Sequence, residues 1–573
     1  MSGAGKWGCL LLPVWFGLLV GPLLFSDSGR AASSSPAIST ANEQRLSPQG
    51  LAELRAVVAA GELSDLTWPD FAHYTTEVSE FYDSLSGTLA WIKGNKPTPQ
   101  ALAMIKLLED AESRGLRPED YDGSRWESRL AGFGKAVTLP ESDLVRFDVA
   151  LTVSTMRYVS DLHLGRVNPA LFHFRFDVAP GTLDLSEFLR REVVGAADVG
   201  AVMSAVDPPF PTYHRTLEAL DRYLDLARKD SGEPLPVPRK TVEPGDIYPG
   251  VPRLARLLAL LGDLGQKGSI PASQTTYSGA LVEAVKHFQE RHGLQADGRL
   301  GVRTLRELNV PLSRRVTQIE LTLERWRWMP HSFQAPPIIV NIPEFRLRAV
   351  DDKYRWVLSM KVVVGKAYRH KTPVFASAIR SVTFRPYWSV PFQIQKDELV
   401  PLFEKDPNYL SQHSYEVVDA QQSLITDTSV SPEVMDQLRA GILFVRQRPG
   451  PDNALGLVRF DFPNPFDVYM HGTPATELFS RSRRDFSHGC IRVEDPVALA
   501  QWVLRDMPQW DSERIRAAMD GSETLRVEIS RPTPVLIVYG TVVVTEDGDV
   551  QFFDDIYRYD AELERALAQH HPD

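Results

Sequence analysis

The pattern of apolar and polar positions divides the chain into a helical first part and a second part made of short strands. Between residues 49 and 235, apolar residues recur at three- and four-residue spacing, for example in 101–108 and 147–164, which is typical of amphipathic helices. Beyond Pro336-Pro337, short aliphatic and β-branched runs are broken by turn residues, which indicates strands. The pattern therefore predicts a multidomain α+β protein with a helical N-terminal scaffold domain over residues 49–235.

A small three-helix module is predicted between these two parts, over residues 244–312. Its second helix has one apolar face, formed by Leu281, Val285 and Phe288, as expected for a helix that covers a core. We expect His287 and His292 of the same segment at the surface of the module.

The third predicted unit is a mostly-β catalytic domain over residues 336–560. Strands are expected at 338–342, 346–350, 358–364, 381–384, 454–460, 467–471, 535–544 and 550–553, and a helix at 496–506. Asp547-Gly548 between the last two strands predicts a hairpin. Residues 393–450 are charged and have a helix- and loop-like pattern, so we expect them to form an insertion that covers the sheet as a lid.

The N-terminus has the pattern of an export signal. Lys6 is the only charged residue before Asp27, and residues 7–25 are almost wholly apolar. This order is typical of a secretory leader, but the apolar run is also near the length that spans a bilayer. Residues 1–32 are therefore interpreted as a signal peptide or a membrane anchor, and the polar residues 33–48 as a flexible tether. Either alternative exports the rest of the chain.

Composition excludes one class of partner. The chain has 573 residues, of which 43% are hydrophobic and 24% charged, and its net charge is −11. These fractions are those of a globular protein, and the negative charge argues against nucleic-acid binding. We expect a monomer that needs no cofactor.

Cysteine usage points to a reactive thiol. The chain has two cysteines, Cys9 inside the leader and Cys490 in the catalytic domain. An exported domain with a single cysteine is unusual, because cysteines pair in oxidising compartments. Such a cysteine is either paired with another molecule or reactive. An inert buried thiol is the structural alternative.

A nucleophilic cysteine needs a base, and histidine is the usual one. Beyond Cys490 only His570 and His571 remain, at the end of the chain, so the base is expected upstream. His471 ends a predicted strand, whereas His488 stands two residues before the cysteine in a glycine-containing turn, where the two side chains seldom meet. We therefore assign His471 as the general base, with the Gly472 carbonyl holding its Nδ1 proton.

The residues around the cysteine predict further parts of a site. Gly489 allows a turn in which the backbone amides of Gly489 and Cys490 face a developing oxyanion. Arg492 either favours the thiolate and a carboxylate-bearing substrate or forms a salt bridge with Glu494 or Asp495. Two histidines and a cysteine are also zinc ligands, but no Asp or Glu is spaced with them as a further ligand, so we expect no metal.

The catalytic segment resembles a known family. His471-Gly472-Thr473 followed by Ser487-His488-Gly489-Cys490-Ile491-Arg492 resembles the active-site signature of the L,D-transpeptidases, whose catalytic fold is called YkuD. The chain as a whole resembles the large periplasmic members of the YcbB type. Residues 284–309 resemble the peptidoglycan-binding repeat of cell-wall enzymes, although a three-helix spacer without a ligand is the alternative.

The resemblance implies a peptidoglycan L,D-transpeptidase of the Gram-negative periplasm. Cys490 would form a thioester with a tetrapeptide stem, release D-Ala and pass the acyl group to a second stem as a 3→3 cross-link. Carbapenems would be expected to acylate the same cysteine. The expected partners are peptidoglycan stem peptides, and the inner membrane if the leader is not cleaved. The residues expected to bind substrate are His488, Arg492, Tyr387, Trp388 and Tyr469. For the three aromatic residues, a place in the core is the alternative.

Two alternatives to transfer remain open at the level of sequence. The first is an L,D-carboxypeptidase or another hydrolase that uses the same site. The active-site motif does not distinguish an amine from water as the acceptor. The second is a wall-binding scaffold whose catalytic domain is idle, although an intact pair of His471 and Cys490 argues against it.

Overall fold

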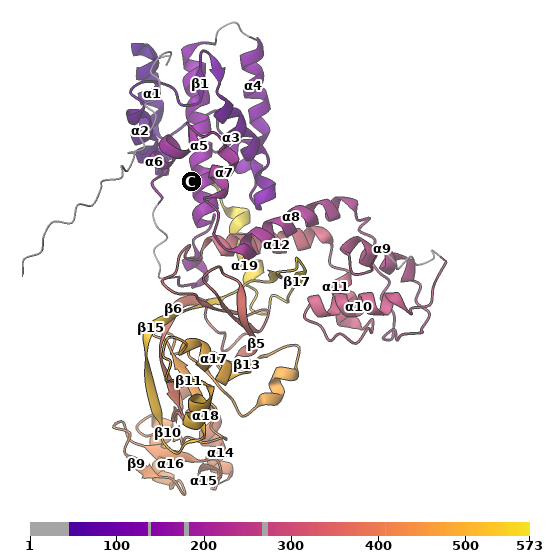
Figure 1. The fold of residues 1–573 in the computed structure, drawn as a ribbon, viewed down its shortest axis with the longest axis vertical. Coiled ribbons are helices and arrows are strands. Elements are labelled where there is room, and N and C mark those ends of the chain that lie inside the picture. Colours follow the sequence, from indigo (N-terminus) through magenta and orange to yellow (C-terminus); the bar gives the residue numbers. More distant parts are fainter. Residues whose placement is uncertain (1–44, 136–138, 177–182, 266–272, 407, 573) are drawn as a thin grey trace, which may run out of the picture. The chain divides into compact units, whose positions relative to one another are not determined.

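The computed structural model describes residues 45–135, 139–176, 183–265, 273–406 and 408–572 (Figure 1). The predicted leader and most of the predicted tether lie outside these residues. Within the described ranges, no helix is both long enough and apolar enough to cross a membrane. The described elements belong to one compact unit, residues 44–573.

The first part is helical, as predicted, and is organised around one long helix. This helix, α5 (Glu141–Leu164), is buried along most of its 24 residues, so side chains on all its faces contribute to the core. The helices around it are α1 (Pro48–Ala60), α2 (Thr75–Ser84), α3 (Pro99–Glu109), α4 (Trp126–Lys135), α6 (Leu185–Phe188) and α7 (Val199–Ser204). Ser47 and Thr98 begin α1 and α3 by accepting backbone N–H bonds, the role that N-cap residues have.

Two further helices connect this part to the sheet. Helix α8 (Pro211–Lys229) lies in the predicted scaffold segment. Its buried residues nevertheless share a core with α12 (Leu312–Arg327) and with the hairpin of β16 (Val542–Val544) and β17 (Val550–Phe552). The three-helix module has its own core and contains α9 (Val251–Leu261), α10 (Ala280–Arg291) and α11 (Val302–Leu308).

The second part is built on a nine-stranded sheet with the order β13-β5-β14-β12-β11-β6-β15-β3-β4, in which β4 also pairs with β5, so that the sheet closes on itself. Its strands are β3 (Ile338–Asn341), β4 (Arg346–Val350), β5 (Trp356–Gly365), β6 (Phe375–Phe384), β11 (Val458–Asp461), β12 (Met470–His471), β13 (Asp485–Ser487), β14 (Ile491–Val493) and β15 (Leu525–Val538). Helices α17 (Pro496–Val503), α18 (Ser512–Asp520) and α19 (Tyr559–Gln569) contribute buried residues to its core. The predicted hairpin is confirmed, since β16 (Val542–Val544) pairs with β17 (Val550–Phe552) around Asp547-Gly548.

The insertion, residues 393–450, is more ordered than its pattern indicated. It contains α14 (Val400–Lys405), α15 (Tyr409–Gln412) and α16 (Pro432–Ala440). It also contains β8 (Tyr415–Val418), β9 (Leu424–Thr426) and β10 (Phe444–Gln447), which form a four-stranded sheet with β7 (Trp388–Ser389). The expectation of helix and loop alone was wrong, because strands of two to four residues are too short to show a clear alternation.

Candidate active site

Two neighbouring parallel strands carry His471 and Cys490. Met470 pairs with Ile491 and His471 with Arg492, and Cys490 directly precedes β14. Met470 and Ile491 are fully buried in the core. Because side chains alternate between the two faces of a sheet, His471, Cys490 and Arg492 project together from the opposite face.

His471 is held in one tautomer. Its Nδ1 lies 2.6 Å from the carbonyl oxygen of Gly472, and a carbonyl can only accept, so Nδ1 carries the proton and Nε2 keeps its lone pair. The ring is buried. Burial, followed by the charge of Arg492, lowers the pKa of His471 to about 3. The residue is therefore a neutral imidazole at neutral pH.

Cys490 is a half-buried thiol. Its Sγ lies 3.8 Å from the carbonyl oxygen of Asp467. Burial raises the pKa of the Cys490 thiol, although hydrogen bonds from Tyr469 and the charge of Arg492 act in the opposite direction. The thiolate-favouring effect expected of Arg492 is thus present but is outweighed by desolvation.

The turn before Cys490 requires a glycine. Gly489 has a φ of +119°, and its missing side chain would have free space, with no other atom nearer than 3.9 Å, so the requirement comes from the backbone. Its N–H donates to Ser487 Oγ at 3.2 Å, and that hydroxyl donates to the Cys490 carbonyl at 2.6 Å. Among the described residues the Cys490 N–H has no hydrogen-bond partner. This leaves the Cys490 amide open to an oxyanion, whereas the Gly489 amide predicted beside it is occupied.

Arginine, tyrosine and aspartate side chains complete this face of the sheet. Arg459 pairs in register with His471, and its guanidinium lies 5.3 Å from the Tyr469 ring centre and 2.7 Å from Asp461. Arg492 forms no ion pair within the described part of the chain, because Glu494 lies against Lys361 and Asp495 caps α17. The salt bridge that was its alternative role is therefore absent, and its charge faces the site.

The other residues assigned to substrate binding have different surroundings. His488 Nε2 lies 2.6 Å from Glu398 Oε1, so the insertion contacts the turn that carries Cys490.

Tyr387 is exposed under the guanidinium of Arg446, and Trp388 packs on the core of the insertion. Within the described residues, no hydrogen bond or ring contact joins Tyr387 or Trp388 to Cys490 or His471. Their assignment to substrate binding stays a prediction.

Three residues of this site were not found from the sequence. Thr372 donates from Oγ1 to the Gly489 carbonyl at 2.7 Å and so fixes the turn before Cys490. Arg459 and Glu398 belong to segments far from the cysteine motif. Register alone could have indicated Arg459, since it pairs with His471, but that register depends on which strands become neighbours.

The described residues contain no cluster of His, Cys, Asp and Glu that could hold a metal ion. The groups that do converge are a neutral imidazole, a thiol, an open backbone amide and two arginines. This set suits nucleophilic attack by sulfur on a carbonyl carbon of an anionic substrate.

Comparison with known proteins identifies the domains. Residues 336–543 match the family described as "L,D-transpeptidase catalytic domain", residues 248–308 match "Putative peptidoglycan binding domain" and residues 76–220 match "Scaffold domain". The chain is 32% identical over 252 residues to the "Putative L,D-transpeptidase" of Haemophilus influenzae, a match that covers 44% of this chain and 50% of that protein. The chain thus spans about half the length of the curated relative that it matches.

Two solved structures are also similar. They are the L,D-transpeptidase of Xylanimonas cellulosilytica, at 19% identity and a TM-score of 0.18, and that of Stackebrandtia nassauensis, at 16% identity and a TM-score of 0.20. Each match covers 53% of this chain, and 100% and 97% of those chains respectively. The family assignment rests on the sequence matches: this chain carries an L,D-transpeptidase catalytic domain together with a peptidoglycan-binding domain. The resemblance stated from the active-site motif is therefore confirmed.

Proposed function

We propose that the protein is a peptidoglycan L,D-transpeptidase that forms 3→3 cross-links through a thioester on Cys490. The observation that carries this proposal is the placement of Cys490 and His471 on one face of adjacent strands, within the residues that match the catalytic domain. His471 is neutral and has its Nε2 lone pair available, which is the state that a general base needs.

The first step is attack on the donor stem. Cys490 Sγ bonds to the carbonyl carbon of the amide between diaminopimelate and the terminal D-Ala, while His471 takes the thiol proton. The Cys490 N–H donates to the oxyanion. The carbon–nitrogen bond then breaks, His471 returns the proton to the leaving amine, and D-Ala departs, leaving a thioester.

The second step is attack by the acceptor. The side-chain amine of diaminopimelate on another stem bonds to the thioester carbon, and His471 removes a proton from that amine. The carbon–sulfur bond breaks, the sulfur recovers its proton, and an amide links the two stems. Carbapenems enter the same first step as acyl donors that resist the second, so they are expected to acylate Cys490.

The rest of the chain serves this reaction at the cell wall. The peptidoglycan-binding domain at residues 248–308 holds the polymer near the catalytic domain, and the enzyme works in the periplasm as a monomer without a cofactor. The N-terminal segment is a cleaved leader or an inner-membrane anchor.

The test is mass spectrometry of products formed from purified disaccharide-tetrapeptide. Wild-type protein is expected to give 3→3 dimers and free D-Ala, and Cys490→Ala is expected to lower both by about 10³-fold or more, because the nucleophile is lost. Cys490→Ser serves as a control of nearly the same size, and it should fold like the wild type but remain almost inactive. Tripeptide without dimers would instead identify an L,D-carboxypeptidase. Dimers that persist in Cys490→Ala would refute the proposal.

A further inference from the structure

A cleft of about 940 Å³ separates the three-helix module from the large sheet. Its walls come from the module (Glu290, residues 292–296 and Arg303), from residues 343–346 and Lys361 of the sheet, from residues 479–484 and Phe486, and from Gln551 of β17 with Phe553, Asp554 and Ile556 after it. Cys490 and His471 do not line it.

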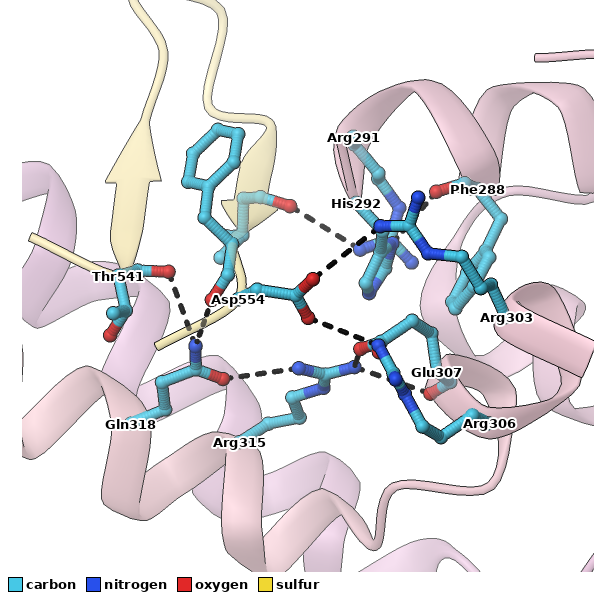
Figure 2. A network of polar contacts seen from close by, with 12 residues as sticks. Phe288, Arg291, His292, Arg303, Arg306, Glu307, Arg315, Gln318, Thr541 and Asp554 are labelled. Carbon is cyan, nitrogen blue, oxygen red and sulfur yellow. Dashed lines mark hydrogen bonds and ion pairs between the residues drawn. The ribbon is translucent and has the colours of Figure 1, made fainter. Parts of the chain in front are cut away.

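The cleft is cationic. Its lining includes six basic side chains: Arg303, Arg346, Lys361, Arg481, Arg483 and Arg484. The three acidic ones are Glu290, Glu344 and Asp554. Four of the basic side chains already have acidic partners: Arg303 pairs with Asp554 (Figure 2), Arg346 with Glu344, Lys361 with Glu494 and Arg483 with Asp485. The positive excess therefore comes from Arg481 and Arg484. A positive excess in a concave surface attracts anions.

Two arginines of this wall have no acidic partner in the described part of the chain. Arg484 is buried, and its guanidinium donates to backbone carbonyls, among them those of Val362 and Phe345 at 3.2 and 3.0 Å. Burial, and then the charge of Arg346, lower the pKa of Arg484 to about 10. Arg481 is exposed and lies over the Phe486 ring at 5.4 Å. Arg484 therefore contributes structure and charge, while Arg481 can reach a ligand.

The cleft lies on the same side of the sheet as the thiol. On β5, Lys361 is two residues from Val363, which pairs with Arg492, so Lys361 projects from the face that carries Arg492 and Cys490. Lys361 is opposite Glu494, which follows the end of β14 and lies four residues beyond Cys490. At about 3.4 Å per residue this separation is roughly 14 Å, and an extended chain of four residues spans at most about 14 Å.

We propose that this cleft binds a carboxylate-bearing peptide stem of peptidoglycan while another part of the polymer occupies the Cys490 site. The inference rests on the proposed function for the identity of the polymer. The carboxylates of the stem provide the acidic partner that Arg481 lacks, and the cleft lies within about one stem length of the thiol, so one polymer can reach both sites. The peptidoglycan-binding domain, whose residues 290–296 form one wall, supplies the neighbouring surface for the polymer.

The test measures binding rather than turnover. Full-length Cys490→Ala protein is titrated by calorimetry with disaccharide-tetrapeptide and with the same compound after amidation of its stem carboxylates. Arg481→Glu in this background is expected to weaken binding of the acidic compound about tenfold, the usual effect of losing a charged hydrogen bond. Arg481→Gln should give a smaller loss in the same direction. The matched control is Arg516→Glu, on the exposed surface of α18, which should leave the affinity unchanged.

The outcomes separate this proposal from the proposed function. Equal affinities in Arg481→Glu and Arg516→Glu, undetectable binding, or equally tight binding of the amidated compound would each overturn the cleft assignment. Turnover of wild-type protein and of Arg481→Glu with Cys490 intact is measured in parallel. If cross-linking proceeds equally well in Arg481→Glu, only the cleft assignment is refuted. If Arg481→Glu weakens binding but wild-type protein shows no turnover, only the proposed transpeptidase reaction is refuted.

Discussion

Burial shifts the pKa values of the two side chains at the centre of the site, His471 and Cys490, in opposite directions. It lowers the pKa of His471 to about 3 and raises that of the Cys490 thiol. Both groups are therefore uncharged at neutral pH, and the pair does not rest as a thiolate and an imidazolium. The neutral imidazole takes the proton as sulfur attacks, so no separated charges need to be buried before the reaction begins.

This state predicts an unusual pH profile. Protonation of His471 would abolish the base, but its pKa of about 3 lies below the ordinary value of 6.5, so kcat/KM should stay level as pH falls from 7 to about 5. The raised pKa of Cys490 similarly keeps the thiol protonated as pH rises to 8. Initial rates measured across this range check the prediction. A loss of rate with an apparent pKa between 6 and 7 would contradict it.

Backbone strain at Gly489 gives a second residue-scale prediction. Gly489→Ala is expected to cost about 1–3 kcal/mol, because a side chain at φ +119° is disfavoured, and to displace the Cys490 turn, lowering activity at least about tenfold. Gly548→Ala is the matched control, since Gly548 also has a positive φ, +87°, and nothing near its missing side chain. It should lower the melting temperature similarly while leaving the rate intact. Equal rates in both variants would contradict the predicted role of the turn.

At this scale the sequence predicted contacts that depend on neighbours along the chain. The Gly472 carbonyl was expected to hold His471 Nδ1, and it lies there at 2.6 Å. The expectation that His292 lies at the surface was wrong, because the ring is buried between Phe288 and Phe552. Phe552 comes from a hairpin more than 250 residues away, and no local pattern indicates such a neighbour. Glu398 beside His488 was missed for the same reason.

Helices and strands show the same difference between features set by the local sequence and features set by distant segments. Helix α10 and strand β4 lie close to their predicted positions. The predictions for two long strands were wrong at their starts, since β6 begins six residues and β15 ten residues before the predicted position. The short strands of the insertion were missed, since their pairing rather than their pattern defines them. The closure of the large sheet through β4 and β5 likewise depends on long-range pairing, and it places Arg346 opposite Lys361.

The contact between Glu398 and His488 predicts that the insertion affects catalysis. Glu398→Gln removes the charge that the insertion places 2.6 Å from the His488 ring. Both side chains are partly exposed, so the change should alter stability by less than about 1 kcal/mol. It should loosen the insertion over the Cys490 turn and raise KM several-fold with little change in melting temperature. Steady-state kinetics and hydrogen exchange of residues 392–400 measure the two effects.

The control for this variant lies in the same insertion. Glu404→Gln removes an exposed pair with Arg439 that does not leave the insertion, so KM should not change. A KM for Glu398→Gln equal to that of Glu404→Gln would mean that the contact has no role in substrate binding.

At the scale of the whole molecule, a polar network joins the three-helix module to the catalytic domain. Figure 2 shows Arg315 of α12 between Glu307 of the module and Gln318, which in turn donates to the Thr541 carbonyl. The Arg315 guanidinium also lies 4.7 Å from the Phe552 ring centre. Charged groups in this position cost desolvation energy unless each keeps its partner, so the network favours one docking geometry for the module. That geometry also forms one wall of the cationic cleft.

Removing Arg315 should therefore undock the module. Arg315→Met leaves Glu307 half-buried without its principal partner, which is expected to cost about 3–5 kcal/mol and to split a single thermal transition into two in calorimetry. Arg314→Met is the control, because Arg314 pairs with Glu564 at the exposed surface, and its transition should stay single.

The pKa of Glu307 is lowered by Arg315 and Arg306 although burial opposes them, so the contribution of Glu307 to stability is complete above pH 4.5 and is lost as the pH falls below that value. The difference between Arg315→Met and wild type should accordingly shrink in acid, and a difference that is independent of pH would show that packing against Phe552, rather than the ion pair, holds the module in place.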